Sequence, residues 1–124
     1  MTLSPQHDPM GQAVLDYLQN GQAEAIAVHS TIFDDDEIPV SHLFRTFTEM
    51  PPLERAALSY ARGRVLDVGA GAGCHALALQ TQGHEVVSID VSPGCVAAMR
   101  QRGLQQVQLA DFFTDDFGKD YDTI

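Results

Sequence analysis

From Arg64 to the end of the chain, short apolar runs alternate with longer segments whose apolar residues recur every three or four positions. The short runs are typical of buried strands, whereas the wider spacing is typical of helices. Strands that alternate with helices predict a parallel sheet with crossover helices, which is a mixed α/β fold. The predicted strands are Val65–Val68, Glu85–Asp90, Val107–Asp111 and the start of a fourth at Tyr121–Ile124.

Two crossover helices are predicted between these strands. The first covers Cys74–Gln82, and the second begins with Ser92 as its cap and Pro93 as its first residue. The spacing of apolar residues predicts which side of each helix faces the sheet. In the first helix these residues are Cys74, Leu77, Ala78 and Thr81, and in the second they are Val96 and Met99.

Residues 1–63 lack this alternation and predict a mostly helical N-terminal extension. Asp8-Pro9 has the form of a helix cap followed by proline, and Asn20-Gly21 marks the end of that helix. Pro51-Pro52 opens a second helix that extends through Arg62. The residues expected on its inward face are Leu53, Ala56, Ala57 and Tyr60.

The pattern between these two helices is weaker. Ala25–Ser30 predicts a short strand, and Asp34–Glu37 predicts a solvated acidic turn. Val40–Met50 has apolar residues at helical spacing but no clear cap, so its structure stays open.

The predicted fourth strand begins where the sequence ends. Half of a doubly wound sheet would have an open edge and uncovered apolar surface. We therefore expect residues 64–124 to be the first half of an α/β domain, truncated at the start of strand four. We also expect either a longer parent protein or a homodimer or domain swap that covers the open edge.

Composition narrows the possible partners. The chain has 124 residues, 44% of them hydrophobic, and a formal net charge of −10, which disfavours a nucleic-acid backbone or an anionic membrane as the main partner. No apolar run is long enough for a membrane span, and residues 1–10 do not resemble a signal peptide. Cys74 and Cys95 are expected to be reduced thiols, which favours a cytoplasmic protein.

A glycine-rich turn follows the first predicted strand of the sheet. Gly69, Gly71 and Gly73 alternate with alanines, so a ligand could lie against backbone that carries few side chains. The helix that follows offers free N–H groups at the same place. The dinucleotide fingerprint G-x-G-x-x-G fails here, because Cys74 occupies its last glycine position.

The pattern Asp67-x-Gly69-x-Gly71-x-Gly73, with its flanking strand and helix, resembles motif I of the class I S-adenosylmethionine-dependent methyltransferases. The resemblance implies a Rossmann-like fold and S-adenosylmethionine as cofactor, with S-adenosylhomocysteine as product. It places the methionine part of the cofactor beside Asp67, Gly69, Ala70, Gly71 and Gly73.

Further landmarks follow in the expected order. Asp90 ends the second strand, where a carboxylate can accept hydrogen bonds from both ribose hydroxyls. Val91 is expected to pack on the adenine ring. In the family, an acidic residue at the position of Asp111 often accepts a hydrogen bond from the adenine amino group, and Phe112 is expected beside the ring.

Other functions stay open. The alternatives are a non-catalytic or incomplete adenosine-binding fragment and an aminopropyl transferase of the same fold, and an NAD-linked oxidoreductase ranks lower because of Cys74. Residues that align the methyl acceptor, expected to be a small molecule, usually follow strand four, so no catalytic residue is assigned and this chain alone is expected to be inactive.

Arg45 is a candidate lid residue over the cofactor or acceptor. The histidines and cysteines lack the spacing of metal ligands, and no metal site is predicted.

Overall fold

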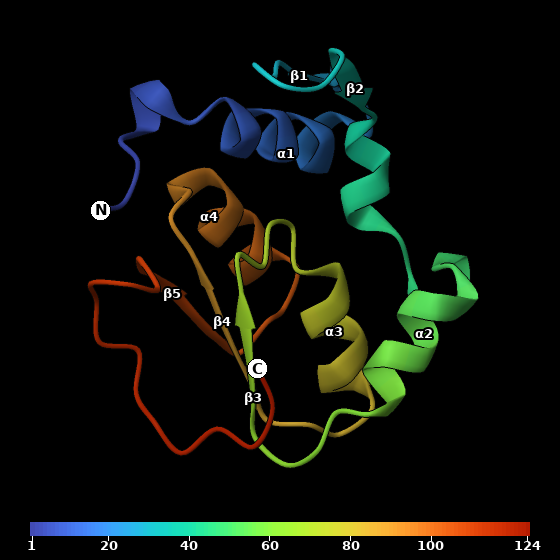
Figure 1. The fold of residues 1–124 in the computed structure, drawn as a ribbon, viewed down its shortest axis with the longest axis vertical. Helices are drawn as coiled ribbons and strands as arrows, with labels where there is room; N and C mark the ends of the chain where they lie inside the picture. Colours follow the sequence, from blue (N-terminus) through green and yellow to red (C-terminus); the bar gives the residue numbers. More distant parts are fainter.

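The computed structural model describes residues 1–124 and shows a mixed α/β fold (Figure 1). Three parallel strands, β3 (Val65–Val68), β4 (Val86–Asp90) and β5 (Gln106–Leu109), form a sheet in that order. The crossover helices α3 (Cys74–Thr81) and α4 (Pro93–Gln101) connect them. The alternation of strands and helices expected from the sequence is therefore confirmed.

The main core lies between the sheet and one side of these two helices. Ala76 and Leu79 of α3 pack with Val96 and Met99 of α4 against the strands. The other face of the sheet carries Leu66, Val87 and Ile89, which pack with Phe117 and Tyr121 of the C-terminal segment. The sheet thus has helices on one face and an extended segment on the other.

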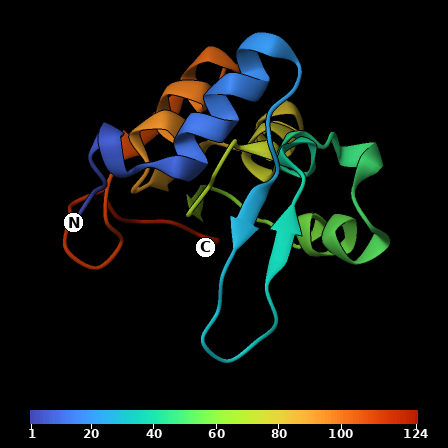
Figure 2. The same ribbon diagram turned by 90° about the horizontal axis from the view of Figure 1, so that it is seen from above.

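The N-terminal third adds a helix and a hairpin to this core. α1 (Pro9–Asn20) packs along α4, and the antiparallel strands β1 (Ile26–Val28) and β2 (Asp36–Ile38) project from the body as a hairpin (Figure 2). The predicted acidic turn is therefore partly wrong, because Asp36 and Glu37 belong to β2 and pair with Val28 and Ala27.

Short 3-10 helices and one α-helix connect the hairpin to the sheet. The 3-10 helices are η1 (Pro5–His7), η2 (Val40–Phe44) and η3 (Phe47–Glu49), the last two lying in the segment that the sequence left open. α2 (Pro52–Ser59) follows them and precedes β3.

The predicted inward face of α2 is wrong. Leu53 and Tyr60 are 82% and 77% exposed, and Ala56 and Ala57 are exposed as well. The apolar contact instead comes from Leu58, which packs against Met50 and the main core. α2 lies beside α3, on the side away from the strands, so only a narrow stripe of the helix reaches neighbouring residues (Figure 1).

The predicted face of α3 is also partly wrong. Ala76 and Leu79 are buried in the main core, and the predicted residue Leu77 packs against the same core. Cys74 and Ala78 instead contact Met50 on another side, and Thr81 is exposed. The helix is apolar around most of its circumference, so periodicity alone does not identify the buried side. The assignment of Val96 and Met99 in α4 is confirmed.

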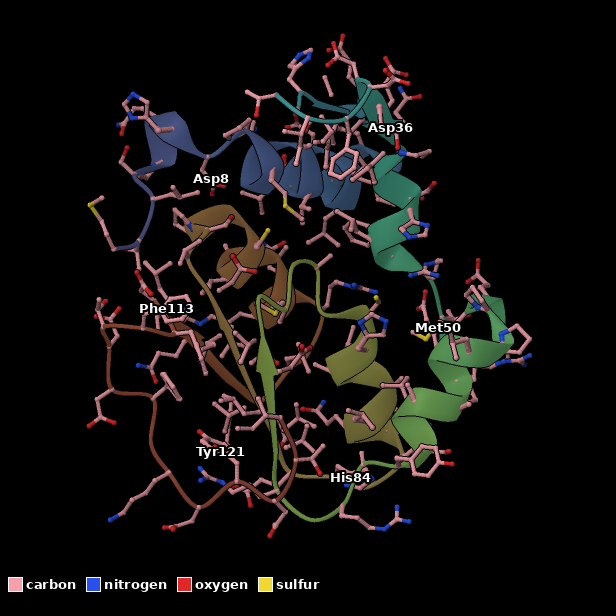
Figure 3. The ribbon with its side chains drawn as sticks, in the orientation of Figure 1. Asp8, Asp36, Met50, His84, Phe113 and Tyr121 are labelled. Atoms are coloured by element: carbon pink, nitrogen blue, oxygen red, sulfur yellow. The ribbon has the colours of Figure 1, made fainter.

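Asp8 joins α1 to α4. Its carboxylate accepts hydrogen bonds from the Gly11 N–H (2.9 Å), the Ser92 hydroxyl (2.8 Å) and the Gly94 N–H (2.8 Å). Asp8 is only 4% exposed and lies at the start of α1 (Figure 3). One carboxylate therefore caps two helices, and the backbones approach so closely that a Cβ on Gly94 would lie 2.6 Å from the Gly11 Cα.

The C-terminal segment returns to the sheet beside β3. Thr123 forms a parallel bridge with Val65, and the Leu66 N–H donates to the Thr123 carbonyl at 2.9 Å. The start of a fourth strand is thus present as a single bridge. None of the helices combines the length and apolar character that crossing a membrane requires.

Candidate functional site

The turn between β3 and α3 has an unusual backbone conformation. Gly69, Gly71 and Gly73 have φ angles of +67°, +60° and +83°, a region that residues with a side chain rarely adopt. A Cβ on Gly73 would lie 2.7 Å from the Leu104 Cδ1, whereas a Cβ on Gly69 would meet no atom within 4 Å. Gly73 therefore serves packing, and Gly69 borders open space.

Asp90 holds this turn against the end of β4. Its Oδ2 accepts a hydrogen bond from the Gly71 N–H at 2.8 Å, and its Oδ1 accepts one from the Ser92 N–H at 2.9 Å. The N–H groups of Gly69 and Ala70 donate to the Ile89 carbonyl at 2.9 and 3.1 Å. The glycine turn and the carboxylate predicted to bind ribose are therefore in direct contact.

The residues predicted for adenine follow at the ends of β4 and β5, and the N-terminal segment covers them. The Val91 carbonyl accepts a hydrogen bond from the Leu3 N–H at 2.8 Å. The Asp111 carboxylate contacts the terminal ammonium of Met1, and this contact, together with a hydrogen bond from the Phe113 N–H, lowers the pKa of Asp111. Residues 1–3 thus lie over the region predicted for adenine.

Phe112 belongs to a small aromatic cluster rather than to a single pocket wall. Its ring stacks on Phe117 at a centroid distance of 5.5 Å and meets the edge of Phe113 at 5.4 Å. It remains 39% exposed, so one part of the ring is free to contact a ligand.

Asp67 lies apart from the aromatic cluster, beside a cavity of about 300 Å³ that His75 and Glu54 also line. Its Oδ2 is buried without a hydrogen-bond partner. Burial raises the pKa of Asp67, an effect that the nearby His75 opposes and Asp90 reinforces. Asp67 therefore lines the cavity and carries one buried acceptor atom without a partner.

A chain of polar contacts leads from this cavity to Arg45. The His75 Nε2 lies 3.0 Å from one Glu54 oxygen, and the Arg45 Nη1 lies 3.0 Å from the other. Arg45, the candidate lid residue, is thus tied to α2 through Glu54. The side chain of Cys74 and the Glu54 carboxylate raise the pKa of His75 to about 9, although burial acts in the opposite direction.

This shift predicts a pH dependence of stability. The pKa of His75 in the folded protein, about 9, is above the ordinary value of 6.5. Protonated His75 therefore contributes to the free energy of unfolding fully below pH 6.5, and this contribution is lost as the pH rises through 9. We expect the His75 imidazole to titrate near pH 9 in an NMR experiment, and at a lower pH in Glu54→Gln. Glu85→Gln, which removes a surface carboxylate paired with Arg64, should leave that titration unchanged. A wild-type midpoint near 6.5 would contradict the prediction.

Sequence reasoning missed three features of this region: the double cap formed by Asp8, the placement of residues 1–3 over Val91 and Asp111, and the link from His75 to Arg45. The Asp8-Pro9 pair signalled a helix start, but its partners Ser92 and Gly94 lie 84 and 86 positions away in the sequence. Small residues at Gly11 and Gly94 were the available signal of close helix packing.

Known proteins are similar to this chain in sequence and in fold. A family model described as a methyltransferase domain matches residues 65–123, which include all three strands of the sheet and the glycine turn. An uncharacterised methyltransferase of Staphylococcus carnosus is 39% identical over 66 residues, which cover 53% of this chain and 32% of that protein.

Two solved structures are also similar. A methyltransferase from Bacteroides fragilis, crystallised with S-adenosylhomocysteine, is 48% identical with a TM-score of 0.88 over 94% of this chain and 48% of that chain. A sugar N-methyltransferase from Streptoalloteichus is 26% identical with a TM-score of 0.52, covering 80% of this chain and 45% of that chain. The chain therefore spans less than half the length of each of these three proteins. The family match over residues 65–123 and the similarity in fold support a class I S-adenosylmethionine-dependent methyltransferase.

Proposed function

We propose that the glycine turn and the ends of β4 and β5 bind S-adenosylmethionine, and that the protein transfers its methyl group to a small molecule. The observation that carries this proposal is the contact between the Gly71 N–H and Asp90. It joins the turn expected at the methionine part of the cofactor to the carboxylate expected at the ribose. The similarity to a methyltransferase crystallised with S-adenosylhomocysteine supports the same assignment.

The donors and acceptors present fit such a cofactor. A carboxylate has about four lone-pair sites, and Asp90 uses two of them for Gly71 and Ser92, so both oxygens can still accept from a ribose hydroxyl. The Cβ side of Gly69 is open, and the Asp67 Oδ2 has no partner. An amino group in the nearby cavity would satisfy that buried oxygen.

The residues of this chain would contribute binding and orientation. When bound, the cofactor supplies a methyl group on a sulfonium. Asp90 would fix the ribose, the backbone at Gly69 would allow close approach, and Asp67 would accept a hydrogen bond directly or through water. Correct alignment of the reacting atoms supplies much of the rate enhancement in such a displacement. We propose a small-molecule acceptor because the net charge of −10 disfavours a nucleic acid.

Gly69 offers a matched test. Gly69→Ala places a methyl group in the open space beside the turn. We expect it to weaken binding of S-adenosylhomocysteine about tenfold or more, which corresponds to a loss of at least about 1.4 kcal/mol of binding free energy. Gly83→Ala is the control, because Gly83 also has a positive φ (+96°) and open space around its Cβ. Both variants should lose similar stability. Equal affinities of the two variants in calorimetry would argue against the proposed cradle.

A further inference from the structure

A second cavity lies on the side of α3 away from the sheet, with a volume of about 410 Å³. We call it the arginine cavity, because Arg45 and Arg102 both line it. The segment around η3, one side of α3 and the end of α4 form its walls. Its apolar and hydroxyl-bearing lining includes Phe47, Leu77, Ala78 and Thr81. Apart from Arg45, the candidate lid residue, none of its lining residues is among those predicted to contact the cofactor.

Arg102 is a half-buried cation without a counterion. Its guanidinium lies 4.6 Å from the centroid of the Phe44 ring, and its Nη1 donates to the Ala72 carbonyl. None of the five ion pairs in the structure includes it. Burial lowers the pKa of Arg102, as expected for a cation removed from water. An anion would complete this environment, because a desolvated charge is costly unless it is paired.

Arg45 supplies a second guanidinium with donors to spare. Its Nε donates to the His42 carbonyl and its Nη1 to Glu54, while its Nη2 has no partner. Its side chain is only 14% exposed. No carboxylate lines the arginine cavity, although the chain carries 17 acidic and only 7 basic residues. Two of those seven cations therefore line a single cavity, and the one acidic partner of the pair, Glu54 on Arg45, lies outside its lining.

The apolar lining restricts the kind of anion. Phe47, Leu77 and Ala78 offer carbon surface next to the two guanidinium groups. A fully hydrated inorganic anion would use the charges and leave this surface wet, whereas an apolar group would bury it. The planar guanidinium fork matches a carboxylate in geometry and charge. We propose that the arginine cavity binds a small organic carboxylate whose apolar body lies against α3.

Benzoate is a suitable probe, and benzamide is its neutral counterpart of similar shape. Binding to the whole chain, without cofactor, is followed by NMR through the amides of Phe47 and of residues 77–81. We expect benzoate to bind saturably and to shift these amides. Benzamide should bind at least about tenfold more weakly, because it lacks the charge that strengthens hydrogen bonds to the guanidinium groups. Equal affinities, or shifts confined to Gly69–Gly71, would overturn the proposal.

Two pairs of variants locate the effect. Arg102→Gln should weaken benzoate binding about tenfold or more. The control is Arg100→Gln, which replaces an exposed arginine in the last turn of α4 and should leave the affinity unchanged. Thr81→Glu keeps both arginines and adds a carboxylate at the cavity, so it should also weaken binding, and Thr81→Gln should not. Unchanged affinity in Thr81→Glu, or equal losses in the two arginine variants, would overturn the proposal. Because these measurements need no cofactor, their outcome is independent of the proposed methyl transfer.

Discussion

Replacing Asp8 with alanine is expected to lower the free energy of unfolding by about 3–5 kcal/mol, because it leaves buried hydrogen-bond donors without an acceptor. Three donors lose their partner at once: the N–H groups of Gly11 and Gly94 and the hydroxyl of Ser92. Ordinary domains are stable by about 5–15 kcal/mol, so this loss is a large share of the total. Chemical denaturation with urea measures it directly.

Two further variants separate capping from general effects of charge. Asp8→Asn retains one acceptor oxygen and should lose less stability than Asp8→Ala. Asp16→Ala removes a carboxylate from the same helix that accepts only from the Gln12 side chain, and it should cost less than about 1 kcal/mol. If Asp8→Ala and Asp16→Ala lost similar stability, the double cap would not be the connection between α1 and α4.

Asp90→Ala is expected to reduce affinity for S-adenosylhomocysteine about a hundredfold or more, because each hydrogen bond to a charged group contributes about 1.5–3 kcal/mol. The substitution removes the acceptor proposed for both ribose hydroxyls. It also releases the Gly71 N–H, which the carboxylate now fixes at 2.8 Å. Calorimetric titration of folded protein measures the loss.

Asp116→Ala serves as the control for Asp90→Ala. Asp116 is an exposed carboxylate that accepts from the Gly118 N–H, and it lies outside the predicted site. Its affinity for S-adenosylhomocysteine should equal that of the wild type. Asp90→Asn retains one acceptor oxygen and should fall between the two. If Asp90→Ala bound as tightly as Asp116→Ala, Asp90 would not contact the cofactor.

The features that local sequence encodes were predicted well. Short apolar runs gave the three strands, and the caps at Asp8 and Ser92 gave the starts of α1 and α4, because each signal involves neighbours in the chain. The glycine turn was also located from its own residues, since positive φ angles require glycine there. The order of these elements was enough to predict the sheet.

The features that depend on distant contacts were not predicted. The apolar spacing predicts Leu53 and Tyr60 on the inward face of their helix, but a helix at the periphery of the fold buries only the side that its neighbours cover. Nothing near Asp8 indicates Gly94, and nothing near His75 indicates Glu54. These pairings arise when the chain folds, so a single sequence does not reveal them.

One calorimetric comparison tests whether the glycine turn and Asp90 bind S-adenosylmethionine. The folded wild-type chain is titrated with S-adenosylhomocysteine and, separately, with NADH. NADH also contains adenosine, but it is the ligand expected for the dinucleotide fingerprint, which Cys74 interrupts in this chain. We expect saturable binding of one S-adenosylhomocysteine per chain and no binding of NADH. Binding of NADH, or no binding of S-adenosylhomocysteine by folded protein, would contradict this prediction.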